Sequence, residues 1–132
     1  MYVTPIYAAL AALLFSRLSV RVLSLRRRLG VPIGDGGNPE ILRAMRVHAN
    51  FAEYTPITLL MIFMLELSGA PLPLIHALGL SLLAGRLSHA MGVSQVDEDY
   101  RYRVVGMAMT FTPLICAAVG ILVRTGMQLA GL

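Results

Sequence analysis

Four polar side chains share one face of a segment that is otherwise apolar: Arg43, Arg46, Asn50 and Glu53. Their spacings of three, four and three residues place them on one side of an α-helix, which turns once in about 3.6 residues. An apolar run over 57–65 continues the segment. Because a charge at bilayer depth costs about 2.5–3.5 kcal/mol on insertion scales, a membrane helix with this stripe must face another helix or a wet cavity.

The stripe offers donors and acceptors that complement a small zwitterion. Arg46 would bind a carboxylate, Asn50 would pair with an amide, and Glu53 would pair with an ammonium group. A zwitterionic peptide fits this set. The alternative is an interhelical polar network that only holds a bundle together, and the spacing alone leaves both interpretations open.

More arginines flank the stripe. They are Arg26, Arg27 and Arg28 after the first apolar segment, and Arg101 and Arg103 before the last one. All eleven basic residues of the chain are Arg, whose planar guanidinium binds carboxylates bidentately. Three adjacent arginines are also typical of a cytoplasmic membrane anchor. Together with Arg43 and Arg46, the set predicts an electropositive mouth suited to a carboxylate-bearing ligand.

Composition indicates an integral membrane protein. Of the 132 residues, 57% are hydrophobic and 14% are charged, whereas about a quarter of a soluble domain is charged. Four apolar segments, each close to the ~20 residues that cross a bilayer, lie at about 2–25, 40–68, 72–91 and 103–129. We therefore predict an all-α, single-domain protein over 1–132, in which four membrane-spanning helices form an antiparallel bundle.

The distribution of arginine predicts the orientation of this bundle. The first and third connections and their flanks carry seven arginines, whereas the turn at 68–71 carries none. Because arginine-rich connections stay in the cytoplasm, both termini should lie on the non-cytoplasmic side. The candidate site residues then gather at the cytoplasmic end. Polar residues within the spans also need partners, so we expect an oligomer with sites at subunit boundaries.

Several other chemistries are disfavoured. Cys116 is alone in an apolar stretch, which excludes a disulfide within the chain and predicts a buried structural thiol. The three histidines show no ligand spacing, so we expect no metal site. The arginines lie next to apolar spans, where a membrane surface explains them better than nucleic acid does, so we expect no nucleic acid partner. The acidic run Asp97, Glu98 and Asp99 is interpreted as a solvated cluster that caps a helix and can pair with Arg101 and Arg103.

The segment 43–56 reads Arg-Ala-Met-Arg-Val-His-Ala-Asn-Phe-Ala-Glu-Tyr-Thr-Pro. It resembles the signature helix of the MAPEG family, the membrane-associated proteins of eicosanoid and glutathione metabolism. The family pattern is roughly Arg-x-x-Arg-x-x-x-Asn-x-x-Glu-Tyr-x-Pro, and each fixed position is matched. Segment 22–27, Arg86, Arg103 and Gly106 are also similar to the family. The resemblance covers nearly the whole chain and is nearest to the short bacterial branch.

This resemblance implies a homotrimer in the bacterial inner (plasma) membrane, with glutathione bound between neighbouring protomers on the cytoplasmic side. Carried over by position, the glutathione-binding residues would be Arg26, Arg46, Asn50, Glu53 and Tyr54. Arg103, or alternatively Arg27, would stabilise the glutathione thiolate. That thiolate would attack a lipophilic small molecule dissolved among the membrane lipids.

The chain departs from the eicosanoid branch at two positions, where His89 and Val93 stand roughly in place of tyrosines. Two functions are therefore weighed: a glutathione transferase or peroxidase, and a non-catalytic member of the fold that binds a lipid or a protein partner. A small multidrug exporter is disfavoured, because the first span has Arg17 and Arg21 but no acid, and the chain has no Trp.

Overall fold

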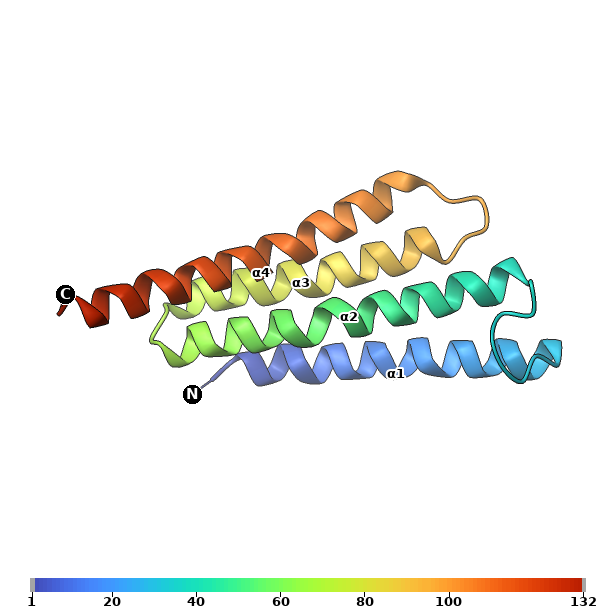
Figure 1. The fold of residues 1–132 in the computed structure, drawn as a ribbon, viewed down its shortest axis with the longest axis horizontal. Coiled ribbons are helices and arrows are strands. Elements are labelled where there is room, and N and C mark those ends of the chain that lie inside the picture. Colours follow the sequence, from blue (N-terminus) through green and yellow to red (C-terminus); the bar gives the residue numbers. More distant parts are fainter. Residues whose placement is uncertain (1, 132) are drawn as a thin grey trace.

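The computed structural model describes residues 2–131, and these residues form four α-helices and no strand. The helices are α1 (Thr4–Leu29), α2 (Pro39–Leu67), α3 (Leu72–Val93) and α4 (Tyr100–Leu129). They run antiparallel in chain order, with both charged connections at one end of the bundle and both ends of the chain at the other (Figure 1). The prediction of an all-α antiparallel bundle is confirmed.

Local signals set the helix boundaries. α1 ends at Gly30, whose φ of 66° is left-handed, a conformation that glycine adopts without a Cβ penalty. α2 begins after Asn38, whose side-chain oxygen accepts from the backbone N–H groups of Glu40 at 2.9 Å and Ile41 at 3.2 Å. The carboxylate of Asp99 accepts from the N–H of Arg101 at 2.9 Å. This cap starts α4 three residues earlier than the apolar pattern predicts.

Two of the helices, α1 and α4, are long and apolar enough to cross a membrane by length and composition. α2 and α3 carry polar residues in their interiors, among them Asn50, Glu53 and Arg86. α2 and α3 each pack against the three other helices, whereas no contact between α1 and α4 is found within residues 2–131. Composition thus supports spans for α1 and α4, and the spans of α2 and α3 stay predictions.

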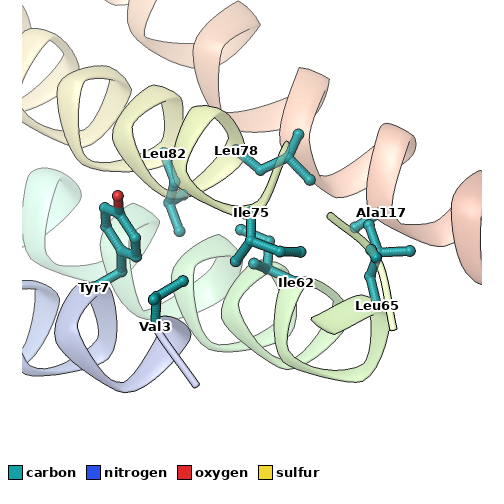
Figure 2. Close-up of a cluster of buried hydrophobic side chains, with 9 residues drawn as sticks. Val3, Tyr7, Ile62, Leu65, Ile75, Leu78, Leu82 and Ala117 are labelled. Atoms are coloured by element: carbon teal, nitrogen blue, oxygen red, sulfur yellow. The ribbon is translucent and has the colours of Figure 1, made fainter. Parts of the chain in front are cut away.

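The hydrophobic core is densest near the ends of the chain. Figure 2 shows Ile62 of α2 beside Ile75 of α3, Tyr7 of α1 at one edge of the cluster, and Leu65 of α2 beside Ala117 of α4 at the other. The Glu66 carboxylate closes this end, because it accepts from the backbone N–H groups at positions 3 and 4 at 2.6 and 3.0 Å. The beginning of α1 is therefore tied to the end of α2, and the opposite end of the bundle is left to form a site.

Glycines bring α3 and α4 into close contact at that opposite end. A Cβ added to Gly106 would lie 2.6 Å from the backbone nitrogen of His89 and 2.8 Å from the carbonyl oxygen of Gly85. Neither neighbour can move without a shift of α3, because both are backbone atoms. The Gly106 contact therefore fixes how far apart His89 and the start of α4 lie.

We expect Gly106→Ala to destabilise the fold by about 1–3 kcal/mol, because the added methyl group overpacks the α3–α4 contact. Gly126→Ala is the matched control, since Gly126 also lies in α4 and has nothing within 4 Å of the added Cβ. The free energy of unfolding of this control should rise by about 0.5–1 kcal/mol, because alanine has a higher helix propensity than glycine. Thermal unfolding of the two variants in detergent measures the difference, and equal midpoints would contradict the close contact.

The prediction of a buried Cys116 was wrong, because this side chain is exposed on α4. The buried positions of α4 are Gly106, Thr110, Pro113 and Ala117, which recur every three or four residues along one stripe. Cys116 lies off that stripe. Apolar neighbours in the sequence did not reveal this, because both faces of a helix in lipid are apolar.

Candidate functional site

A cavity of about 600 Å³ lies at the end of the bundle that carries the charged connections. It is bounded by the first half of α2, the end of α3 and the start of α4, and Figure 1 shows α4 diverging from α2 toward this end. Its lining residues are Pro39, Leu42, Arg43, Arg46, Ala49, Asn50, Glu53, His89, Val93, Glu98, Tyr100 and Arg103. Six of these twelve residues carry a charge or an amide group.

Four of the predicted site residues meet in this cavity: Arg46, Asn50, Glu53 and Arg103. Asn50 is half-buried and the other three are exposed. Within residues 2–131, no hydrogen bond or ion pair engages the side chains of Arg46 and Glu53. A cation and an anion about two helical turns apart thus line the cavity with no partner among the described residues.

Asn50 has a partner within the bundle. Arg86 of α3 donates from Nη1 to the side-chain oxygen of Asn50 at 2.8 Å and to its backbone carbonyl at 3.3 Å. Arg86 is 1% exposed, so its charge is enclosed by protein. The interhelical network considered as the alternative therefore exists at Asn50. The side-chain NH₂ group of Asn50 is still available as a donor on the cavity side.

Glu98 connects α2 with α4 across the cavity. Its Oε2 accepts from Nη1 of Arg43 at 2.9 Å, and its Oε1 lies 3.9 Å from Nη1 of Arg103. The Glu98 side chain is only 5% exposed, so the prediction that it is solvated was wrong. The two arginines enclose it. The capping role was correctly placed in the acidic run, and Asp99 fills it.

Three other predicted residues do not reach this cavity in the single chain. Arg26 and Arg27 line a separate hollow of about 440 Å³ at the end of α1. Arg26 donates from Nη2 to the Met45 sulfur at 3.5 Å. Tyr54 packs edge-to-face on Phe111 of α4, with 5.2 Å between ring centroids. The predicted glutathione ligands thus lie in three places: three of them in the cavity, Arg26 in the separate hollow, and Tyr54 against α4.

The sequence analysis did not assign Arg43–Glu98 as a pair, and it left His89 undecided. His89 is 5% exposed and lines the cavity beside Val93. The topology alone could have predicted both the Arg43–Glu98 pair and the place of His89, since an antiparallel bundle brings its first and third connections to the same end. That topology places the acidic run at 97–99 next to the start of the helix that carries Arg43.

Comparison with known proteins agrees with these features. The sequence profile of the MAPEG family matches residues 4–123. The chain is 39% identical over 113 residues to the inner membrane protein YecN of Escherichia coli K12, covering 86% of this chain and 85% of that protein. YecN of a second Escherichia coli strain, O6:H1, matches with the same identity and coverage. With four helices, a polar stripe on α2 and a profile match over nearly its full length, the chain belongs to the MAPEG family of membrane proteins.

Proposed function

We propose that this protein binds glutathione in the α2–α4 cavity and acts as a glutathione transferase or peroxidase on lipophilic electrophiles. The observation that carries the proposal is the meeting of Arg46, Asn50, Glu53 and Arg103 in one cavity of a MAPEG protein. Glutathione has two carboxylates, one ammonium group and two amides. Arg46 can bind a carboxylate, Glu53 the ammonium group and Asn50 an amide.

Arg103 is the residue proposed to activate the thiol. A nearby guanidinium favours the thiolate, which is the nucleophile, and so lowers the pKa of the bound thiol. In the transferase reaction, the sulfur lone pair forms a bond to the electrophilic carbon, and the leaving group departs with its electron pair. Half of the Arg103 side chain is accessible (52% exposed), which is compatible with contact to a ligand.

A homotrimer in the inner membrane completes the proposal. Arg26 and Arg27 lie on a different surface from the cavity, and a neighbouring copy could bring such a surface to the mouth of the site. Arg17 is exposed in the middle of the apolar helix α1, where a charge needs a partner. The name of the relative YecN, an inner membrane protein, supports this location. In this orientation the arginine-rich end of the present bundle would face the cytoplasm.

Titration calorimetry of glutathione into the detergent-solubilised protein tests the proposal. We expect measurable binding below millimolar glutathione and a loss of affinity of about 10- to 150-fold in Arg46→Ala, because a charge-assisted hydrogen bond contributes about 1.5–3 kcal/mol. Arg101→Ala is the matched control, since Arg101 carries the same charge, lies near the mouth and does not line the cavity. Undetectable binding of the wild type at millimolar glutathione would refute the proposal.

A second candidate is a non-catalytic protein that binds a lipid or a partner in the same groove. The specific observation in its favour is that His89 and Val93 supply the α3 side of the cavity, so no tyrosine hydroxyl from that helix is available. Binding of glutathione without conjugation or peroxide reduction across a panel of electrophiles would select this candidate.

A further inference from the structure

Glu98 lies in the connection 94–99 between α3 and α4, and we call its contacts with Arg43 and Arg103 the Glu98 clasp. Oε2 accepts from Arg43 at 2.9 Å, and Oε1 lies 3.9 Å from Arg103. Oε1 is buried and accepts no hydrogen bond within the described residues. The carboxylate is therefore buried with only one of its two oxygens well paired.

Such a carboxylate is costly to keep in place. Buried polar atoms are nearly always hydrogen-bonded, and a charged atom that is not so satisfied carries a desolvation penalty. Glu98 is nonetheless one of the residues that line the cavity, together with Arg43, Arg46 and Arg103. A ligand carboxylate would seek the same guanidinium groups. Glu98 thus already occupies a position that an anionic ligand would take.

The connection that carries Glu98 is held at both ends. Between them the Gln95 N–H donates to the Gly92 carbonyl at 3.4 Å, and no backbone hydrogen bond within residues 2–131 holds 96–98. Arg21 donates from Nη1 to the Ser94 hydroxyl and from Nη2 to the Ser94 carbonyl, so the end of α3 is anchored to α1. Asp99 caps α4. Gln95, Val96 and Asp97 are exposed. Withdrawal of Glu98 therefore needs movement of only four residues, 95–98, and leaves the helices in place.

We propose that Glu98 is an internal competitor for the ligand carboxylate: it holds Arg43 through a close ion pair, and Arg103 only loosely, until a carboxylate displaces it, and it thereby sets the specificity of the site. The inference rests on the proposed function, because it concerns the same cavity. A simple monocarboxylate gains contacts only with the arginines of the cavity, which are those that Glu98 gives up and Arg46. A zwitterionic peptide also gains contacts with Glu53 and Asn50, which Glu98 does not use. Competition by Glu98 for Arg43 therefore weakens the binding of small anions more than that of ligands with several polar groups.

Calorimetry of glutathione and of propionate with Glu98→Gln tests the proposal. If the clasp is closed in about nine molecules of ten, its loss should tighten glutathione binding about tenfold and make propionate binding detectable. Asp97→Asn is the matched control, because it removes the same charge from the same connection at an exposed position without an ion pair. Its affinities should stay within about twofold of wild type. Glu98→Ala, which cannot accept from Arg43, should tighten binding at least as much as Glu98→Gln.

Amide hydrogen exchange gives a readout that does not depend on glutathione. Glu98→Gln should speed exchange at 95–98 at least about fivefold relative to Asp97→Asn, since local opening sets the exchange rate of such segments. Unchanged exchange, or unchanged or weaker glutathione binding by Glu98→Gln, would overturn the clasp. If the wild type binds no glutathione, the proposed function fails. The clasp is then supported by faster exchange together with propionate binding in Glu98→Gln, and it is overturned if either is missing.

Discussion

Replacing Arg103 by alanine should lower the rate of glutathione conjugation at least about 100-fold, the loss typical when one preorganised charge-stabilising donor is removed from an active site. Arg103 lines the cavity from α4, and its only ion-pair contact within residues 2–131 is the long 3.9 Å approach to Glu98. It can therefore turn to a bound sulfur without breaking a strong contact. Glutathione affinity should change much less than the turnover rate.

The pH dependence of turnover separates this role from a merely structural one. A cation beside the sulfur lowers the pKa of the thiol, so the wild type holds the reactive thiolate at lower pH. Without Arg103, the thiol pKa rises toward its free value, and the rate profile must shift to higher pH. The thiolate absorbance of the bound tripeptide measures the same shift directly. Arg103→Lys should restore part of the rate, and Arg101→Ala should leave the profile unchanged.

Two results would contradict this assignment of Arg103. An unshifted pH profile in Arg103→Ala with a lowered rate would mean that the residue acts only on packing. A normal rate in Arg103→Ala with a lost rate in Arg27→Ala would transfer the role to Arg27, the alternative that the family resemblance leaves open.

Arg86→Ala should be the most destabilising single change in this bundle, by about 3–5 kcal/mol. The substitution empties a large volume in a fully enclosed position and strands the side-chain oxygen of Asn50, to which Arg86 now donates, and each of these losses costs about 1–3 kcal/mol. Arg86→Met should cost less, because a flexible thioether fills the space next to Met107. Thermal unfolding in detergent measures both.

A double-mutant cycle assigns the loss to the Arg86–Asn50 pair. Once Asn50 is replaced by Leu, removal of Arg86 no longer strands a side-chain amide oxygen, so Arg86→Met in that background should cost less than it does in the wild type. Additive effects would show that the two side chains are energetically independent despite the 2.8 Å contact. The exposed control Arg101→Ala should leave the unfolding midpoint within about 0.5 kcal/mol of wild type.

The sequence was sufficient for the order and direction of the helices, because each apolar segment is bounded by strong local signals. The Asn38-Pro39 start of α2 and the Gly30 end of α1 are examples. It was also sufficient for the stripe that brings Arg46, Asn50 and Glu53 to one cavity, since helical periodicity fixes which side chains share a face.

The burial and the partners of individual charged side chains could not be predicted from the sequence, since they depend on contacts between segments far apart in the chain. Glu98 lies in an acidic run that reads as solvated, and only the approach of α2 and α4 encloses it. Arg26 and Arg27 follow the family pattern, yet in one chain they line a different hollow from Arg46. Which of these two surfaces meets the other depends on how copies assemble, and no local pattern encodes that.

The exposure of Cys116 has a practical consequence. The chain has one thiol, and it lies outward on α4, so a maleimide spin label or fluorophore can be attached at a single known point without mutagenesis. Quenching by brominated lipids would then report whether that face of α4 touches acyl chains. In a threefold-symmetric assembly, pulsed electron paramagnetic resonance would return one inter-label distance shared by all three copies.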